Sequence, residues 1–185
     1  MPFAFWPTAP LIGLALVFLY FLVAGARTFV ILPGDERPSW VAQMSFAGTG
    51  AFATMALGYR AQLPSANALA AFALVAASLT LYEWARRTIR DRRFRIAWSG
   101  EVPGALCEEG PYRRIRHPVY AAYILVFAGL LAALPSWWTL AIFAGNAALF
   151  AHAARHDERA MAANPLASAY ATYRARTGMF VPRWR

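Results

Sequence analysis

The sequence predicts an all-α integral membrane protein with about five transmembrane helices, and two observations predict it. Hydrophobic residues make up 59% of the 185-residue chain and charged residues only 15%, whereas a soluble domain carries roughly a quarter charged residues. The apolar residues form long runs without aspartate, glutamate, lysine or arginine, at 2–26, 38–59, 61–82 and 118–154. A helix needs about 20 apolar residues to cross the hydrocarbon core. The first three runs therefore fit one span each, and the fourth fits two.

The first three spans are expected at about 10–32, at about 40–63, and from near Ser65 past the membrane surface. A Pro-Gly pair at 33–34 ends the first span and Pro64 ends the second, because proline cannot continue a helix. A cleaved signal peptide is the alternative for the first run. Such peptides need a positively charged segment at their start, and no arginine or lysine precedes this run.

The fourth run is expected to form a helical hairpin. A Leu-Pro-Ser step at 134–136 divides it, because proline next to a small polar residue favours a turn. Pro118 suits the first turn of the fourth helix. The fifth helix is expected at about 137–154, with a continuation into the tail. Residues 90–109, between the third and fourth spans, are polar and are expected to be irregular.

The charge distribution predicts the orientation of the chain. The net charge is +9, and every basic residue is arginine. In a soluble protein this balance would indicate nucleic-acid binding, but here the positive-inside rule explains it. With five spans every arginine except Arg60 falls on one side, whereas four spans would place the tail opposite the large basic loop. We therefore expect no nucleic-acid partner. We expect an N-terminus outside and a cytoplasmic C-terminus in a bacterial inner membrane.

Three motifs are interpreted as structural. Residues 48–53 match the letters of a dinucleotide fingerprint, but they lie inside an apolar span, where small residues let helices pack closely. Cys107 is the only cysteine, so it has no disulfide partner within the chain. His152 and His156 have the spacing of metal ligands on a helix, but no third ligand is evident, so no metal site is predicted.

Residues 108–120 contain the most informative pattern, at the start of the fourth helix. A juxtamembrane arginine cluster that holds anionic lipid headgroups would account for Arg113 and Arg114. It does not account for the Gly-Pro-Tyr turn at 110–112 or for the His-Pro-x-Tyr step that leads into the helix. A helix N-terminus attracts an anionic group, and Arg116 beside it would clamp a carboxylate.

A second polar cluster lies at the inner end of the fifth helix. Four of its members share one helical face: His152, Arg155, His156 and Arg159. For most of them a charged helix end in the headgroup region is the expected role. Glu158 stands apart, because a carboxylate beside arginines is held charged and can face a cationic ligand. Tyr170 and Tyr173 follow one helical turn apart, which alone would suit an amphipathic helix on the membrane.

Taken in order, these elements form one pattern across residues 82–184. It consists of Gly110, Tyr112, Arg116, His117, Pro118 and Tyr120, a membrane hairpin, Asp157-Glu158-Arg159, the pair Tyr170 and Tyr173, and Val181-Pro182. The pattern resembles the isoprenylcysteine carboxyl methyltransferase family in its short prokaryotic form. Two departures stand out. Asp157 replaces a glutamate, and the segment 164–168 is one residue longer than the family's Phe-Gly step.

The resemblance implies a single membrane domain over 1–185. Three N-terminal helices in 1–81 would support a methyltransferase core in 82–185, and the C-terminal half of the chain would form a cytoplasmic cofactor pocket. It implies an enzyme that transfers a methyl group from S-adenosylmethionine to a lipophilic acceptor with a carboxylate, thiol or amine. The expected partners are that acceptor and membrane lipids, and the oligomeric state is left open.

The resemblance also implies roles for individual residues. Those expected to carry the chemistry are Arg116, Glu158 and Arg174. Those expected to bind S-adenosylmethionine are Gly110, Tyr112, His117, Pro118, Tyr120, Glu158, Tyr170, Tyr173 and Pro182. Arg116 and His117 would hold the polar end of the donor, and Glu158 would pair with its amino or hydroxyl groups. Tyr120 or Tyr173 would contact the sulfonium through a cation–π interaction. Arg174 or Arg116 would orient an acceptor carboxylate.

Two other classes of function remain as alternatives. One is an NADPH-dependent membrane reductase, because sterol reductases share a similar membrane core. The sequence lacks a clear site for a 2′-phosphate beyond its general excess of arginines. The other is a non-enzymatic membrane protein that binds anionic lipid through its arginines.

Overall fold

The computed structural model describes residues 16, 19–20, 65–89, 106–163 and 165–183. Its elements are α3 (Ser65–Ile89), the short 3-10 helix η2 (Gly110–Arg113), α4 (Pro118–Ala133), α5 (Trp137–Ala162) and α6 (Ala167–Arg176). Within these ranges the chain is helical, without a β-sheet, and this confirms the all-α prediction there. The spans expected at 10–32 and 40–63 lie outside the described residues, apart from Leu16, Leu19 and Tyr20, which are helical.

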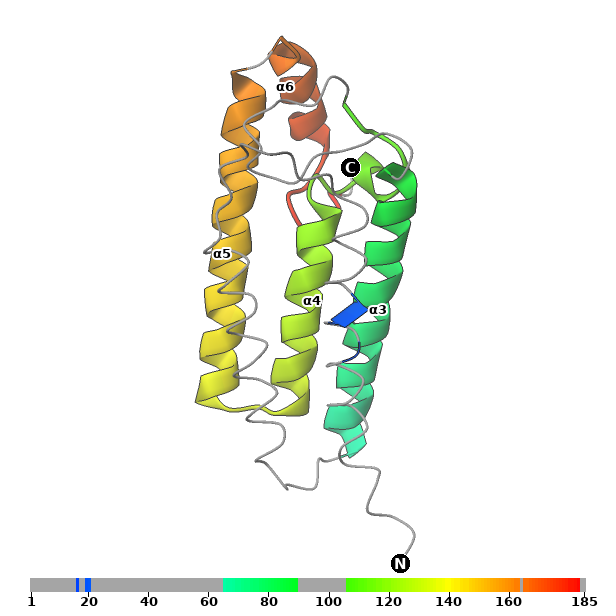
Figure 1. Ribbon diagram of the computed structural model, residues 1–185, viewed down its shortest axis with the longest axis vertical. Helices are drawn as coiled ribbons and strands as arrows, with labels where there is room; N and C mark the ends of the chain where they lie inside the picture. The colour runs from blue at the N-terminus through cyan, green and yellow to red at the C-terminus, as the bar shows by residue number, and fades with distance from the viewer. Residues whose placement is uncertain (1–15, 17–18, 21–64, 90–105, 164, 184–185) are drawn as a thin grey trace, which may run out of the picture.

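The three long helices run side by side along the length of the molecule (Figure 1). α3 and α5 run in one direction and α4 in the other, so that α4 and α5 form the expected hairpin. The turn between them falls at 134–136, as predicted. Ser136 caps α5, because its hydroxyl accepts a hydrogen bond from the amide of Thr139 at 3.3 Å while the Thr139 hydroxyl accepts one from the amide of Ser136 at 3.1 Å. This reciprocal cap sets the start of α5.

Small residues bring α3 and α4 into close contact. Ser78 is fully buried, and its hydroxyl donates to the carbonyl of Ala122 at 2.6 Å. A Cβ atom on Gly129 of α4 would lie 3.3 Å from Cγ2 of Val75, so the helices have little room for a side chain there. The buried core that results comprises Ala71, Val75, Tyr82, Ala122, Val126, Phe127, Leu130, Ala133, Leu134 and Phe150. Close approach of small residues is the usual way in which membrane helices associate.

Apolar side chains cover much of the outer surface of these helices. In the part of the chain that the structure describes, one helix, Asn67–Ile89, is long and apolar enough to cross a membrane by its length and composition, and α4 is a shorter apolar helix. Leu69 and Phe72 of α3 and Trp137 and Trp138 of α5 are exposed. Such an apolar exterior suits lipid contact. The total of five spans and the orientation of the termini stay predictions.

We predict that Gly129→Val destabilises the protein and that Gly145→Val does not to the same degree. Valine at 129 must displace α3, and such overpacking costs about 1–3 kcal/mol. A Cβ atom on Gly145 of α5 meets nothing within 4 Å, so this variant is a matched control for valine in a helix. Thermal melting in detergent, followed by circular dichroism, measures both. Equal melting temperatures for the two variants would contradict the close α3–α4 contact.

Candidate functional site

Nearly all the side chains that the sequence marked as polar candidates meet at one end of the helical bundle. At this end α3 and α5 finish, η2 and α4 begin, and α6 crosses over (Figure 1). Arg116 and the carbonyl of Thr177 that it bonds to are 61 residues apart in the chain. The sequence placed these candidates in two separate clusters, and the fold brings the clusters together.

A short parallel pairing fastens the C-terminal tail to the start of α4. The amide of Arg116 donates to the carbonyl of Gly178 at 2.8 Å, and the amide of Gly178 donates to the carbonyl of Arg114 at 3.0 Å. The amide of His117 donates to the carbonyl of Met179 at 3.1 Å. A Cβ atom on Gly178 would lie 1.9 Å from the carbonyl oxygen of Val181, so the tail can take this path only with glycine at 178. The pairing holds the end of α6 beside Arg116.

Glu158 is at the centre of the site. Its side chain is 6% exposed, and its Oε1 lies 2.7 Å from Nε of Arg116 and 3.4 Å from Nε2 of His117. Its Oε2 lies 3.4 Å from Nε of Arg174. Burial alone would raise the pKa of Glu158, but the contacts with His117 and Arg116 outweigh burial and lower the pKa to about 2. Glu158 is therefore a carboxylate at any physiological pH.

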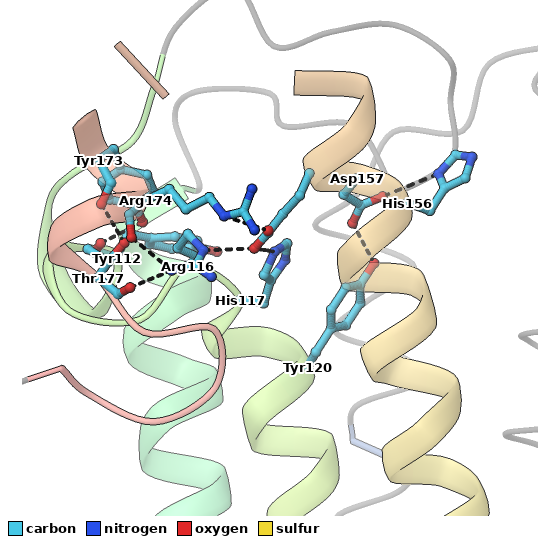
Figure 2. A network of polar contacts seen from close by, with 10 residues as sticks. Tyr112, Arg116, His117, Tyr120, His156, Asp157, Tyr173, Arg174 and Thr177 are labelled. Carbon is cyan, nitrogen blue, oxygen red and sulfur yellow. Dashed lines mark hydrogen bonds and ion pairs between the residues drawn. The ribbon is translucent and has the colours of Figure 1, made fainter. Parts of the chain in front are cut away.

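Arg116 joins Glu158 to the end of α6. Besides its bond to Glu158, its Nη1 donates to the carbonyl of Arg174 at 3.3 Å and to the carbonyl of Thr177 (Figure 2). The hydroxyl of Thr177 in turn donates to the carbonyl of Tyr173 at 2.7 Å. Arg116 is thus held by three acceptors from two distant segments, and its guanidinium has one orientation.

Two tyrosines hold the polar residues in place. Tyr120 donates its hydroxyl to Oδ2 of Asp157 at 3.1 Å, and its ring stacks on the imidazole of His117 with centroids 5.5 Å apart and planes 8° apart (Figure 2). Burial raises the pKa of Asp157. Tyr173 donates its hydroxyl to the carbonyl of Tyr112 at 2.7 Å, which ties α6 to η2. Burial also raises the pKa of Tyr173, so this hydroxyl stays a donor.

A cleft of about 570 Å³ opens between α5 and α6 beside Glu158. It is lined by Glu158, Ala162, Ala167, Tyr170, Ala171, Arg174, Ala175 and Arg183. This volume lies within the range of about 300–1,000 Å³ that is usual for small-molecule sites. Tyr170 is buried in its wall, and burial raises the pKa of its hydroxyl. The cleft therefore combines a fixed negative charge with two arginines, a tyrosine and apolar alanines.

The structure brings six of the predicted residues around Glu158 or into the cleft. They are Arg116, His117, Tyr120, Glu158, Tyr170 and Arg174. Gly110 lies elsewhere, packed on α3, with a φ of 54° and room for no Cβ atom, which would lie 2.3 Å from Oγ1 of Thr88. Pro118 is buried as the first residue of α4. Tyr112 and Tyr173 contact each other, and Pro182 is half-buried in the tail. The catalytic and cofactor-binding roles of all these residues stay predictions.

Sequence reasoning missed Thr177 and Gly178 and the bond between Tyr120 and Asp157. Thr177 accepts a hydrogen bond from Arg116 with its backbone carbonyl. Every residue has such a carbonyl, so the residue type does not predict this contact. Gly178 comes two residues after the end of α6, and a glycine there is a detectable signal for a close approach of the backbone. The partner of Asp157 depends on how α4 and α5 pack.

The comparisons with known proteins give one match. A family model described as phospholipid methyltransferase matches residues 66–164, which is more than half of the chain. The matched range holds most of α3, η2, α4 and α5, including Arg116 and Glu158, and ends before α6. No curated protein and no solved structure matches the chain.

We predict that acid destabilises the protein in the range from about pH 4.5 down to about pH 2, through Glu158. The folded state lowers the pKa of Glu158 from 4.5 to about 2. Its contribution is therefore complete above the unfolded pKa and is lost as the pH falls through the folded one, with an upper limit of roughly 3 kcal/mol. Melting temperatures between about pH 6 and about pH 3 should fall more steeply for the wild type than for Glu158→Gln. Identical slopes would mean that Glu158 is not paired as described.

We predict that Arg116→Lys lowers the free energy of unfolding by about 2 kcal/mol, because a lysine cannot reach Glu158 and both tail carbonyls together. Arg113→Lys is the control. Arg113 is exposed in η2, and an exchange at such a surface position changes stability by no more than about 0.5 kcal/mol. Chemical denaturation in detergent measures both variants. A neutral Arg116→Lys would show that the tail does not depend on the guanidinium.

Proposed function

Because this chain belongs to the phospholipid methyltransferase family, a family of membrane methyltransferases, we propose that it transfers a methyl group from S-adenosylmethionine to a lipophilic acceptor. The family gives the reaction class, and the donor and acceptor are the proposed parts. The observation that carries the proposal is the buried carboxylate of Glu158. It is held charged by Arg116, His117 and Arg174 in the wall of the 570 Å³ cleft.

The charges around the cleft fit the donor. S-adenosylmethionine carries an amino group, a sulfonium, a carboxylate and ribose hydroxyls. Glu158 would pair with the amino group or a hydroxyl. Arg174 is 62% exposed, and an ion pair with such an exposed partner contributes at most about 1 kcal/mol, so it is available to the donor carboxylate. Nε2 of His117 is buried 3.4 Å from Oε1 of Glu158, without a hydrogen bond to any of the described residues, and a polar group of the donor would supply one.

The residues of this chain would act mainly by positioning. When bound, the donor supplies a methyl group on a positively charged sulfur, and transfer of that methyl is an in-line displacement. Its rate depends on how well the reacting atoms are held. Arg116 would hold Glu158 in one orientation, and Tyr120 would hold the imidazole plane of His117. A tyrosine ring would contact the sulfonium through a cation–π interaction. Tyr120 and Tyr173 are the candidates from the sequence, and Tyr170, which lies in the wall of the cleft, is a third.

The acceptor is expected to come from the lipid. The described helices have exposed apolar side chains such as Leu69 and Phe72, and the site is at one end of the bundle (Figure 1). A water-soluble donor and a lipophilic acceptor can meet at such an end. The resemblance to isoprenylcysteine carboxyl methyltransferases supports an acceptor carboxylate, thiol or amine. Arg174 is better placed than Arg116 to orient a carboxylate, since Arg116 already bonds to Glu158 and two carbonyls.

Calorimetric titration of the detergent-purified protein with S-adenosylhomocysteine tests this proposal. We expect micromolar binding that is lost in Glu158→Gln and kept in Glu109→Gln, which removes an exposed charge at the start of η2. His117→Ala should also weaken binding or turnover. Turnover is measured with methyl-labelled donor and a membrane-lipid extract. Wild-type turnover in a folded double variant of His117 and Glu158 would refute the assignment.

The same titration separates the alternatives. Binding of NADPH without binding of S-adenosylhomocysteine would favour the reductase. Binding of neither ligand by folded protein would favour a lipid-binding role. In that role His117→Gln is silent, and loss of both Arg113 and Arg114 is not.

A further inference from the structure

The cleft beside Glu158 has an apolar end and a charged end. α5 ends at Ala162 and α6 begins at Ala167, and both alanines line the cleft where the two helices are joined. Glu158 lies one turn before Ala162 on α5, and Arg174 lies about two turns after Ala167 on α6. The charged side chains therefore gather at the end of the cleft that is farther from the link between the helices.

Arg183 joins this charged end from the C-terminal tail. It lines the cleft, and its Nη1 donates to the carbonyl of Ala175 at 2.8 Å. This carbonyl belongs to the last turn of α6, where carbonyls have no amide partner within the helix. The bond uses one of the several N–H donors of a guanidinium. Arg183 is therefore anchored beside Arg174 and still has donors for a ligand.

Arg183 and Arg174 differ in their partners. Arg174 lies 3.4 Å from Oε2 of Glu158, so it binds another anion only by exchange. Arg183 forms no ion pair within the described part of the chain, and Glu158 is the only acid among the residues that line the cleft. The lining residues thus carry one negative and two positive charges, and the positive charge without a carboxylate partner is that of Arg183.

We propose that Arg183 is a specificity-determining residue, which binds the carboxylate at the amino-acid end of the donor while Glu158 binds the ammonium group. This inference rests on the proposed function. The ammonium and the carboxylate of an amino acid are bonded to one carbon atom. A fixed carboxylate and an unmatched guanidinium at one end of the cleft match both charges together. A donor derivative without a carboxylate leaves Arg183 unmatched, so the cleft should bind it more weakly.

The position of Arg183 in the structure is the basis of this assignment. Arg183 comes after the range 66–164 that the family model matches. It also follows Val181-Pro182, the last element of the resemblance to the isoprenylcysteine carboxyl methyltransferases. Its place in the cleft results from the path of the tail, which returns to α6 and bonds to Ala175.

An arginine at the end of a helix also has a structural role, because it satisfies a carbonyl and interacts favourably with the helix dipole. This role predicts that loss of Arg183 weakens every ligand of the cleft to the same degree. Recognition of a carboxylate predicts a loss only for ligands that carry one. A comparison of two ligands therefore separates the two roles.

Calorimetric titration of the detergent-purified protein makes this comparison. The ligands are S-adenosylhomocysteine and its decarboxylated derivative, which keeps the ammonium group and the adenosine. We expect the wild type to bind S-adenosylhomocysteine about tenfold more tightly than the derivative, as one charge-assisted contact provides. In Arg183→Gln we expect S-adenosylhomocysteine to bind about tenfold more weakly and the derivative to bind as before. The two affinities then become equal.

Arg176→Gln is the matched control. Arg176 is exposed in the last turn of α6, forms an ion pair with Glu108 and does not line the cleft. This variant removes a positive charge from the same end of α6, so it reports any general effect of charge. We expect it to keep the tenfold preference of the wild type. Melting curves establish that both variants are folded.

Each outcome decides the proposal. A wild-type preference in Arg183→Gln overturns it, because Arg174 would then supply the preference alone. Equal weakening of both ligands also overturns it and assigns Arg183 a structural role. In both cases binding of S-adenosylhomocysteine by the wild type leaves the proposed methyl transfer intact. Folded wild-type protein that does not bind S-adenosylhomocysteine refutes the proposed donor, and this inference with it.

Discussion

The buried ion pair between Arg116 and Glu158 is the interaction on which the rest of the site depends. The two side chains are 9% and 6% exposed, and they join the link before α4 to the end of α5. Burying two charges is costly, and removal of one partner leaves the other uncompensated, at a cost of about 3–5 kcal/mol. Because Arg116 also bonds to the carbonyls of Arg174 and Thr177, the same pair sets the position of α6 and the tail.

The last turns of α5, beyond its apolar run, carry the acidic residues of the site. The apolar run ends at Ala154, and the helix continues to Ala162. These last turns present Asp157 and Glu158 toward α4 and α6 and leave Arg155 and Arg159 exposed. One stretch of helix thus borders the cleft and bonds to α4. The family match includes this stretch and stops before α6, so Tyr170 and Arg174 come from outside the matched range.

The two departures from the isoprenylcysteine carboxyl methyltransferase pattern both lie beside the site. Asp157, in place of a glutamate, accepts a hydrogen bond from the hydroxyl of Tyr120 at 3.1 Å, which joins α4 to α5. After the longer segment at 164–168, Tyr170 and Tyr173 have different surroundings. Tyr170 lines the same cleft as Glu158, and Tyr173 bonds to the carbonyl of Tyr112.

The sequence by itself determined both ends of α4 and the start of α5, because these boundaries follow from local rules. Proline at 118 and the Leu-Pro-Ser step at 134–136 act within a few residues, and α4 begins and ends, and α5 begins, where these signals predict. The end of α5 at Ala162 was expected only as a continuation of unstated length. The sequence also marked Arg116, His117, Glu158 and Arg174.

Only the tertiary structure decided how these residues pair. Arg116 was expected to meet a ligand carboxylate, whereas it bonds to Glu158, 42 residues away, and to two tail carbonyls. Gly110, one of the residues expected to bind the cofactor, packs on Thr88, a contact that its residue type does not reveal. The reason is physical: in a chain with 18 arginines any of them could neutralise a given acid. Backbone carbonyls are the same at every position, so only folding selects which partners come within bonding distance.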